Sequence, residues 1–311
     1  MQDSYGREID YLRISVTDRC NYRCMYCIPG NGSSRPERER LDAGEYIRIA
    51  AAAVRLGIRK IRITGGEPLV RSDLLTICRG ISSIPGLREL CLTTNGLLLS
   101  EMAGGLKAAG VSRLNISLNS MDPARYASIA SSDTYGRVMD GIHAAEEAGF
   151  TGTKINVVLI KGINDGEIPA FAELTKDRPV SVRFIELMPM GHLKDWAAEH
   201  FVPASRVLEA CPRLIPEESA GVAELYRIPG YRGTVGLIRP LSRRFCGSCS
   251  RLRLTADGML KPCLHSDLEI PLKGLSEEDL SRTILDAVKR KPPHSCFDEV
   301  QGGRDMNEIG G

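Results

Sequence analysis

Six short runs of β-type residues recur along the first 190 residues, and the segments between them carry helical patterns. Such an alternation of strands and helices folds into a parallel sheet with right-handed crossovers. The order therefore predicts an α/β protein built from six β/α units in a row. The runs are YLRISV (11–16), KIRIT (60–64), ELCLT (89–93), RLNISL (113–118), KINVVLI (154–160) and VRFIEL (182–187).

The segment between the first two runs, LDAGEYIRIAAAAVRLG (41–57), illustrates how such a helix is bounded. Asp42 is a suitable N-cap and Glu45 follows three residues later, which is the arrangement of a capping box. Gly57 stands where the helix would end, because glycine readily adopts the left-handed conformation that terminates helices. We therefore expect one helix across this segment.

Polar and apolar residues alternate along these runs, whereas parallel strands buried on both faces are usually almost continuously apolar. In the first run Leu12 and Ile14 fall on one face and Arg13 falls on the other. If the apolar faces meet the helices, the polar faces line the inside of a curved sheet, an open (β/α)6 partial TIM barrel. That interior would hold six cations: Arg13, Lys60, Arg62, Arg113, Lys154 and Arg183.

Several buried, unpaired cations would be strongly unfavourable, so an anion or water must meet them. We therefore predict a wide lumen that binds a highly charged anion, with phosphates as the obvious candidates. The alternative, that a given one of these side chains faces solvent at a strand end, stays open for any single residue.

The pattern changes after residue 190. ELYRIPGYRGTVGLIRPL (224–241) and RLRLTADGML (251–260) read as short antiparallel strands joined by Gly and Pro turns. They predict a small C-terminal α+β region capping the barrel. The expected division is a barrel over 1–190, a C-terminal region over 191–295 and a tail over 296–311.

Composition limits the setting in which the protein works. A formal net charge of +2 argues against a protein that coats nucleic acid. The sequence has no run of about eighteen apolar residues, and MQDSYGREID lacks the basic start and apolar centre of a signal peptide. We expect no membrane span and a cytoplasmic protein, in which the ten cysteines are better explained as metal ligands than as disulfides.

Cys20, Cys24 and Cys27 form a C-x3-C-x2-C motif directly after the first run, without a fourth cysteine nearby. Functional groups of parallel α/β barrels collect at the carboxyl ends of the strands. Structural zinc wants four ligands, whereas a 4Fe-4S cluster held by three thiolates leaves one iron open to another ligand. The motif favours a cluster, and zinc remains the alternative.

Cys246, Cys249 and Cys263 form a second group, C-x2-C-x13-C. Zinc is a more serious reading here, because Cys-x2-Cys is typical of zinc sites and His265 could be the fourth ligand. From these residues alone, zinc and iron–sulfur stay equally open.

The first triplet, with Tyr26 before its last cysteine, resembles the radical S-adenosylmethionine (SAM) superfamily. TGGEP (64–68) follows the second run, as that superfamily expects, and the glycines there would allow close approach of a ligand. The resemblance implies a 4Fe-4S cluster on the first triplet and a SAM site. Its SAM-binding positions would be Tyr26, Gly65, Gly66, Glu67, Ser117 and Met188.

Both triplets together, with the Arg-x-Arg after Cys249 and the terminal MNEIGG, resemble the GTP 3',8-cyclase family (molybdenum cofactor biosynthesis protein A) over essentially the whole chain. The resemblance implies a second 4Fe-4S cluster on Cys246, Cys249 and Cys263. It also implies a GTP site formed by Arg13, Lys60, Arg62, Thr93, Lys154, Arg183, Arg251, Leu252 and Arg253.

The implied reaction is radical SAM conversion of GTP to (8S)-3',8-cyclo-7,8-dihydroguanosine 5'-triphosphate, an early step of molybdenum cofactor biosynthesis. Chemistry at an unactivated ribose C–H bond needs a cofactor. The implied partners are GTP, SAM, an electron donor and cyclic pyranopterin monophosphate synthase, with a homodimer as a further expectation. We expect neither nucleic acid nor membrane as a partner.

Composition predicts that the tail GGRDMNEIGG is disordered, whereas the resemblance implies that Gly310 and Gly311 reach into the active site and act in catalysis. One rival is a radical SAM enzyme for another substrate, whose second cluster recruits Cys211 or Cys296. Another is a zinc-stabilised nucleotide-binding module. Cys78 and Cys91 fall in a predicted helix and strand, where buried packing is the simpler role.

Overall fold

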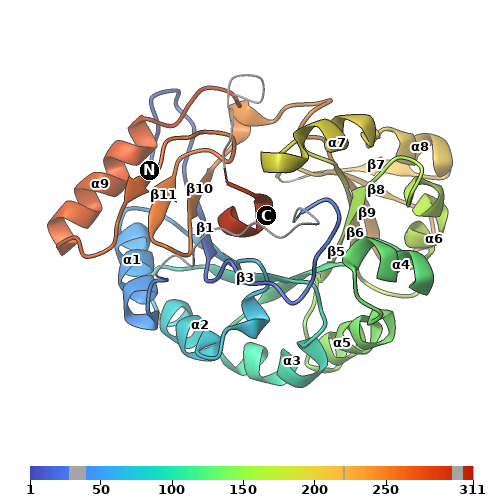
Figure 1. Ribbon diagram of the computed structural model, residues 1–311, viewed down its shortest axis with the longest axis horizontal. Coiled ribbons are helices and arrows are strands. Elements are labelled where there is room, and N and C mark those ends of the chain that lie inside the picture. Colours follow the sequence, from blue (N-terminus) through green and yellow to red (C-terminus); the bar gives the residue numbers. More distant parts are fainter. Residues whose placement is uncertain (28–39, 220, 296–303, 311) are drawn as a thin grey trace.

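One twelve-stranded sheet organises the molecule. The computed structural model describes residues 1–27, 40–219, 221–295 and 304–310. The strand order is β12-β11-β10-β1-β2-β3-β4-β5-β6-β9-β8-β7. The sheet curves into an open arc with helices outside it, and the chain's C-terminal end lies inside the arc (Figure 1).

The six predicted runs form the centre of this sheet. They pair in parallel and in chain order, which confirms the predicted α/β barrel-like arrangement. The strands are β1 (Tyr11–Ser15), β2 (Lys60–Thr64), β3 (Glu89–Thr94), β4 (Arg113–Ser117), β5 (Lys154–Leu159) and β6 (Ser181–Glu186).

Helices follow these strands and cover the outer face of the arc (Figure 1). The Asp42 side chain accepts a hydrogen bond from the Glu45 N–H at 2.8 Å and caps the first helix, as predicted. Gly57 follows that helix with a φ of +115°, which suits glycine. The helices are α1 (Ala43–Arg55), α2 (Leu74–Ser82), α3 (Leu99–Ala108), α4 (Pro123–Ala130), α5 (Tyr135–Glu147) and α6 (Ile168–Glu173).

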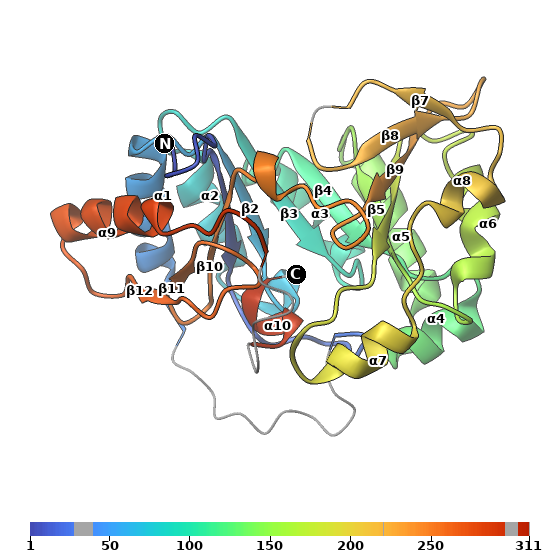
Figure 2. The same ribbon diagram turned by 90° about the horizontal axis from the view of Figure 1, so that it is seen from above.

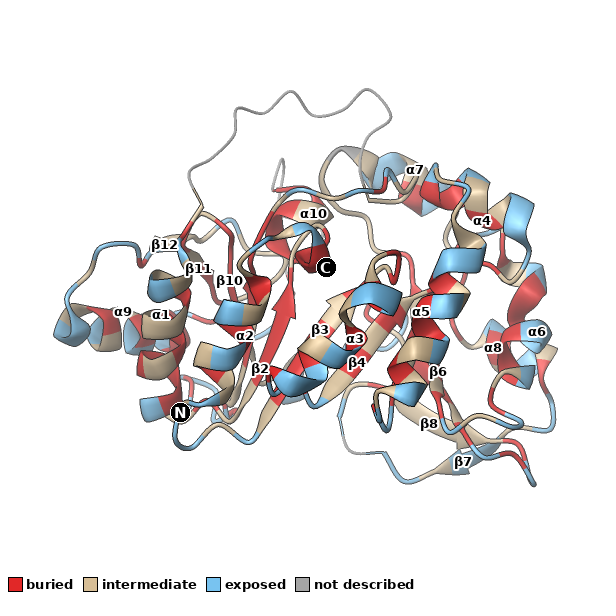
Figure 3. Ribbon diagram, turned by 90° about the horizontal axis from the view of Figure 1, so that it is seen from below, coloured by how far each residue is buried: buried red, intermediate tan, exposed pale blue. Residues whose placement is uncertain are grey.

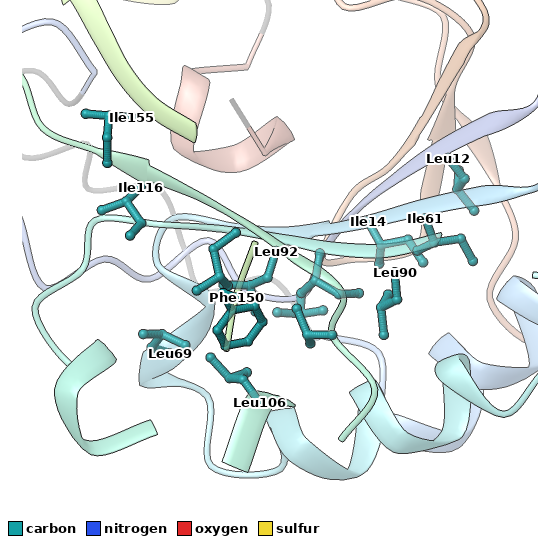
Figure 4. Close-up of a cluster of buried hydrophobic side chains, with 14 of the residues drawn as sticks. Leu12, Ile14, Ile61, Leu69, Leu90, Leu92, Leu106, Ile116, Phe150 and Ile155 are labelled. Atoms are coloured by element: carbon teal, nitrogen blue, oxygen red, sulfur yellow. The ribbon is translucent and has the colours of Figure 1, made fainter. Parts of the chain in front are cut away.

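The hydrophobic core lies between the sheet and these helices (Figure 4). Leu12 and Ile14 of β1 and Ile61 of β2 are 1% exposed or less, and their side chains pack on the helical side. Each such buried side chain contributes about 1.5–3 kcal/mol relative to an exposed one. The helices bury their inner sides and expose their outer sides (Figure 3). The polar face of every central strand is thereby turned into the arc.

The C-terminal region extends the same sheet at both edges, which the strand pattern did not predict. The antiparallel pairs expected there are present, but β9 also pairs in parallel with β6, and β10 pairs in parallel with β1. These pairings occupy backbone groups that would otherwise be exposed at the edges of the six-stranded sheet. The strands are β7 (Ile215–Glu217), β8 (Glu224–Arg227), β9 (Thr234–Ile238), β10 (Arg251–Leu254), β11 (Met259–Lys261) and β12 (Ile270–Pro271).

The remaining helices are α7 (Lys194–Glu199), α8 (Arg206–Ala210), α9 (Glu277–Lys289) and the short α10 (Met306–Ile309). Both views place α10 inside the arc, beside β1 and β10 (Figures 1 and 2). In the described part of the chain, none of the helices has the length and apolar character needed to cross a membrane.

Candidate active site

Cationic side chains from neighbouring strands meet on the inner face of the sheet. Arg13 of β1 is in register with Arg62 of β2 on one side and with Arg253 of β10 on the other. Arg62 is 4% exposed and Arg253 is 6% exposed, so water hardly reaches either. Lys154 and Arg183 face the same space from β5 and β6. The basic lumen expected from strand alternation is therefore present.

The positive charges in this lumen repel one another. Burial, followed by the charges of Arg183 and Arg113, lowers the pKa of Lys154 to about 7. Burial, followed by the charge of Arg251, lowers the pKa of Arg253 to about 10. A bound polyanion would reverse both shifts, because an opposite charge nearby favours the charged form of a base. The lumen is thus suited to a phosphate-rich ligand.

One carboxylate lies at the amino end of the lumen. Glu89 forms ion pairs with Lys60 at 2.5 Å and with Arg113. These two cations are the first residues of β2 and β4, whereas Arg13 and Arg62 lie two residues further along their strands. The lumen therefore has a charge-neutralised amino end and a strongly basic middle.

Buried polar atoms in the lumen also point to a ligand or water. The Oδ1 atoms of Asn115 and Asn156 and the Nε atoms of Arg113 and Arg183 are buried and have no hydrogen-bond partner among the described residues. Such atoms normally contact protein, ligand or ordered water. Because acceptors and donors are both present, they suit a ligand that carries hydroxyl or amino groups as well as phosphate oxygens.

Tyr11 belongs to this site, although the sequence analysis did not single it out. Its hydroxyl accepts a hydrogen bond from Nε of Arg62 at 2.6 Å, and Lys60 lies 5.2 Å from its ring centre. Burial alone would raise the pKa of Tyr11, but the charges of Arg62, Arg13 and Arg251 outweigh it and lower the pKa to about 8. The signal was in the sequence, since Tyr11 shares the face of Arg13 in the alternating run.

Other predicted nucleotide contacts divide between the two faces of the sheet. The hydroxyl of Thr93 accepts from Nη1 of Arg62 at 3.4 Å, so Thr93 faces the lumen. Leu252 is 1% exposed and belongs to the apolar core, so any contact it makes with a lumen ligand would come from its backbone. Cys91, expected to pack, is buried but lies 3.8 Å from Nη2 of Arg113 in the lumen.

The first cysteine triplet occupies the loop that leaves the carboxyl end of β1. The backbone N–H of Cys27 donates to the carbonyl of Cys24 at 2.9 Å, and Met25 N–H donates to Ile129 of α4 at 3.0 Å. Burial, followed by the charge of Cys20, raises the pKa of Cys24 to about 12. Burial, followed by Cys24 and Cys20, also raises the pKa of Cys27. All three thiols thus lie close enough to act on one another.

Such a donor set fits a cofactor that takes up thiolate charge. Within the described ranges, no group of three or more His, Cys, Asp or Glu side chains is placed to hold a single metal ion. The fit to a 4Fe-4S cluster therefore rests on the donors themselves: three neighbouring thiols on one loop, half-buried, at the carboxyl end of a parallel strand. Loading such thiols with metal would release their protons.

The glycines of TGGEP are required by packing against the cysteine loop, in addition to the ligand approach predicted for them. Gly66 N–H donates to Thr17 O at 2.7 Å, and Glu67 N–H donates to Arg19 O at 2.8 Å. A Cβ on Gly65 would lie 2.6 Å from Thr17 O, and one on Gly66 would collide with Arg19 O. The two loops therefore interlock through backbone contacts that larger residues would prevent.

Glu67 joins this pair of loops to the end of β3. It is 1% exposed, and its carboxylate accepts from the Thr94 hydroxyl at 2.7 Å and from Asn95 N–H at 2.6 Å. Burial raises the pKa of Glu67 to about 7, against the effect of these hydrogen bonds. The buried Glu67 side chain therefore holds the TGGEP loop to the end of β3.

The other predicted SAM positions gather at the same end of the barrel. The hydroxyl of Tyr26 accepts from Nδ2 of Asn119 at 2.9 Å, and burial, followed by the charges of Cys24 and Cys27, raises the pKa of Tyr26. Ser117 is the last residue of β4, and Met188 lies two residues beyond β6. All of these positions thus border the carboxyl end of the parallel strands.

The second cysteine triplet lies at the opposite, amino end of the sheet's parallel strands. Cys249 precedes β10, which runs parallel to β1, and Cys263 follows the returning strand β11. Cys249 N–H donates to Cys246 O at 3.2 Å. Burial alone would raise the pKa of Cys249, but the charge of Lys291 contributes most to lowering it.

Cations and a neutral imidazole surround this second triplet. Nζ of Lys291 donates to the carbonyls of Arg251 at 2.8 Å and Pro262 at 2.7 Å. Arg7 donates from Nη1 to Cys246 O at 2.9 Å. Burial, followed by the charges of Arg253 and Arg244, lowers the pKa of His265 to about 3. The lumen therefore connects two triplets that differ in their electrostatic surroundings.

The chain's tail enters the lumen between them. The carbonyl of Gly310 accepts from Nη2 of Arg13 at 3.2 Å and from Nη1 of Arg253 at 2.9 Å. Gly310 has a φ of +69°, and a Cβ there would collide with the hydroxyl of Thr64. The disorder expected from composition is wrong for 304–310, most of which is buried. Gly311 lies outside the described residues.

The other cysteines in the described ranges lie at separate places in the fold. Cys78 of α2 is fully buried in the apolar core, as expected for a packing residue. Cys211 ends α8 and also packs into that core. Cys296 lies outside the described residues.

Comparison with known proteins places this site in a class. Residues 14–175 match the Radical SAM superfamily, and 180–297 match the family described as Molybdenum Cofactor Synthesis C. The crystal structure of Streptococcus suis SuiB bound to S-adenosylmethionine has a TM-score of 0.58 and 15% identity, covering 90% of this chain and 65% of that chain. SuiB supports the fold alone. The chain belongs to the radical SAM superfamily, whose cofactors are those predicted from the first triplet.

Relatives with higher sequence identity show which family within this superfamily the chain belongs to. The GTP 3',8-cyclase of Peptoclostridium acidaminophilum is 49% identical over 99% of this chain and 98% of its own length. That of Pelotomaculum thermopropionicum is 45% identical over 100% of both chains. That of Listeria monocytogenes serovar 1/2a is 42% identical over 100% of this chain and 99% of its own. This protein is a member of the GTP 3',8-cyclase family.

Proposed function

We propose that this chain converts GTP to (8S)-3',8-cyclo-7,8-dihydroguanosine 5'-triphosphate, the early radical SAM step of molybdenum cofactor biosynthesis. One observation supports the proposal most directly. A buried lumen lined by Arg13, Arg62 and Arg253 lies between two separate triplets of cysteines. A triphosphate supplies the negative charge that this lumen lacks, and unpaired acceptors such as Oδ1 of Asn115 suit the ribose hydroxyls or base amino group.

The first triplet would hold the cluster that works on SAM. Cys20, Cys24 and Cys27 would be its ligands, and the coordination position that they leave open would be available to SAM. A cluster held there would supply the one-electron reducing chemistry that SAM cleavage and hydrogen abstraction at C3' of GTP require. The surrounding SAM contacts would come from Tyr26, Gly65, Gly66, Glu67, Ser117 and Met188.

The chain's own contribution is positioning. The lumen cations would hold the triphosphate, while Cys246, Cys249 and Cys263 would hold a second 4Fe-4S cluster against the guanine base. The fixed loops and buried arginines keep the reacting atoms in one arrangement and exclude water. The assigned nucleotide contacts are Arg13, Lys60, Arg62, Thr93, Lys154, Arg183, Arg251, Arg253 and the backbone of Leu252.

Gly310 and Gly311 would complete the site from the tail. Arg13 and Arg253 bind the Gly310 carbonyl in the lumen, so the tail lies beside the proposed triphosphate site. We propose that both glycines are needed for turnover, because bulkier residues would not fit. The proposed division of the chain remains 1–190, 191–295 and 296–311.

Several partners follow from the proposed reaction. Cleavage of SAM needs a one-electron donor, and cyclic pyranopterin monophosphate synthase would consume the cyclised product. We propose the cytoplasm as its compartment, since thiols stay reduced there. A homodimer is a further proposal, to be tested by light scattering.

The decisive experiment is anaerobic incubation of the reconstituted protein with GTP, SAM and dithionite. We expect 5'-deoxyadenosine and the cyclised nucleotide to form together, both depending on GTP. Chromatography with mass spectrometry measures both. Formation of 5'-deoxyadenosine without a cyclised product from GTP would refute the substrate while preserving the reaction class. A colourless, oxygen-stable, zinc-containing protein would refute both.

A further inference from the structure

The strongest cluster of charge outside the lumen anchors the tail. Nη1 and Nη2 of Arg304 donate to the two carboxylate oxygens of Asp257, both at 2.9 Å. Nε and Nη2 donate to the two oxygens of Glu269, both at 2.7 Å. The Arg304 side chain is 7% exposed, so this double bidentate contact is largely shielded from water. We call these three residues the tail clamp.

Charge and geometry both stabilise the contacts of Arg304 with Asp257 and Glu269. Burial alone would lower the pKa of the Arg304 guanidinium, but the hydrogen bonds of Glu269 and Asp257 raise it. Asp257 also accepts from the Thr255 hydroxyl at 2.6 Å, and Glu269 accepts from Lys261 at 3.1 Å. A guanidinium group matches two carboxylates in a fixed orientation, which a lysine ammonium cannot do. The tail clamp therefore fixes the orientation of the Arg304 side chain and also balances its charge.

The clamp holds the tail to the hairpin that also binds its far end. Asp257 lies in the turn between β10 and β11, and Glu269 directly precedes β12. Arg253, on β10, donates to the Gly310 carbonyl. The tail from 304 to 310 is thus attached to one structural unit at its first and its last described residue.

The intervening residues form a compact connection. Asp305 and Glu308 make a capping box around the four-residue helix α10. Nδ2 of Asn307 donates to Asp18 O at 3.1 Å, on the loop that leads to the first cysteine triplet. A helix this short is not stable alone, so its position depends on what holds its ends.

From this geometry we infer that Arg304 is a positioning residue that sets where Gly310 lies in the lumen. It does so by clamping the start of the tail to Asp257 and Glu269. The inference about position rests on these contacts alone, while its effect on turnover rests on the proposed function. The experiment keeps the two separate.

The test compares Arg304→Met with Arg282→Met, since both remove one guanidinium group. Arg282 lies on α9 and pairs with Asp279, and its side chain is 72% exposed. Hydrogen–deuterium exchange of the protein without substrates reports tail docking directly. We expect amide exchange in 306–310 to speed up about tenfold or more in Arg304→Met, as for a locally opened segment. Arg282→Met should exchange like the parent.

Turnover of the reconstituted enzyme gives the second readout. In Arg304→Met we expect kcat to fall about 100-fold, as for an atomic misplacement near the reacting groups, with KM for GTP changing far less. Iron content should stay near that of the parent. Arg304→Lys should recover part of kcat, because it restores the charge without the bidentate geometry.

A third variant separates positioning from stability. Removing Arg304 takes away the guanidinium group that lies between the carboxylates of Asp257 and Glu269, which by itself destabilises the fold. Arg304→Met combined with Asp257→Asn and Glu269→Gln removes that repulsion. We expect its melting temperature to recover while its tail still exchanges rapidly and its kcat stays low. If Arg304→Met fails to fold, this triple variant carries the test.

The outcomes distinguish the inference from the function. If the tail of the folded variant exchanges no faster than that of Arg282→Met, Arg304 does not position the tail. Recovery of kcat together with melting temperature in the triple variant would likewise overturn the inference. If the parent protein does not cyclise GTP while the Arg304→Met tail opens, the proposed function fails and the clamp stands.

Discussion

Each end of the barrel carries three cysteines, and the two triplets have opposite electrostatic surroundings. At the carboxyl end, burial and neighbouring thiols raise the pKa of Cys24 to about 12 and also raise that of Cys27. At the amino end, Lys291 and Arg251 lower the pKa of Cys249 against the effect of burial. Three thiols at each end therefore do not make similar sites, because the surrounding charges influence when a thiol ionises.

The difference suggests separate tasks. Thiols held in the neutral form become thiolates when a metal centre takes up their charge, so loading the first triplet should be strongly coupled to proton release. In the second triplet, the cations that lower the pKa of Cys249 continue into the lumen. The second triplet is thus matched to a site that handles an anionic substrate.

The largest expected effect comes from removing one triplet at a time. Cys24→Ser should abolish formation of 5'-deoxyadenosine, because the cluster that works on SAM is lost. Cys249→Ser should keep about half of the iron, since each triplet would hold one cluster, but yield no cyclised nucleotide. Iron analysis and chromatography of the reaction products measure both.

Cys78→Ala is the matched control, because Cys78 is buried in the apolar core away from both triplets. It should retain all of its iron and both products. If Cys249→Ser still made the cyclised nucleotide, the two ends would not have the different tasks assigned here.

The next effect tests the lumen that connects the two ends. Arg253→Ala removes a guanidinium that is 6% exposed, whereas Arg282→Ala removes one on the surface. The first should weaken GTP binding by about 1.5–3 kcal/mol, the usual value for a charged hydrogen bond, and the second should leave it nearly unchanged. Calorimetric titration with GTP measures this. Equal losses in both variants would mean that net charge, and not the lumen, holds the nucleotide.

Much of this architecture follows from local patterns in the sequence. Strand alternation predicts both the barrel and its basic lumen, because a side-chain period of two assigns Leu12 and Arg13 to opposite faces whatever the tertiary contacts. The same reasoning would have included Tyr11. Capping also follows from local chemistry, as Asp42 and Gly57 demonstrate.

Other features depend on contacts between distant parts of the chain. The sequence does not show that β9 and β10 join opposite edges of one sheet, since each edge could accept either strand. The sequence does not show why Gly66 must be glycine, because its crowding comes from Arg19, on a different loop. The tail resembled a disordered terminus, although Asp305 and Glu308 have capping-box spacing. Its order comes from Arg304 and its distant partners.

A smaller expected effect is a difference in thiol reactivity between the two ends of the barrel. In metal-free protein at pH 8, Cys249 should be alkylated about tenfold faster than Cys24, because the thiolate is the reactive form. The pKa of Cys249 is lowered and that of Cys24 is raised, while both residues are half-buried. Mass spectrometry of peptides after timed iodoacetamide treatment measures the two rates.

Lys291→Met tests the cause of this difference. It removes the charge that contributes most to lowering the pKa of Cys249, so alkylation at Cys249 should slow while that at Cys24 stays the same. Unchanged alkylation of Cys249 would show that Lys291 does not set the contrast between the two triplets.

The smallest effect concerns protons taken up by the lumen. Burial and neighbouring cations lower the pKa of Lys154 from 10.5 to about 7, so the side chain is mostly neutral at pH 8. Between these two values the unfolded chain binds more protons than the folded one, so stability rises with pH across this window. A bound triphosphate would raise the pKa again. GTP binding at pH 8 should therefore take up close to one proton, and affinity should increase as the pH falls from about 9 to 7.

Calorimetry in buffers of different ionisation enthalpy measures that proton uptake. Lys154→Met should remove most of it, whereas Lys161→Met, which replaces an exposed lysine just beyond β5, should leave it intact. If Lys154→Met takes up as many protons as the parent, another lumen group must titrate. Tyr11, whose pKa of about 8 would rise as a triphosphate drew its surrounding cations away, would then be the group to replace with Phe.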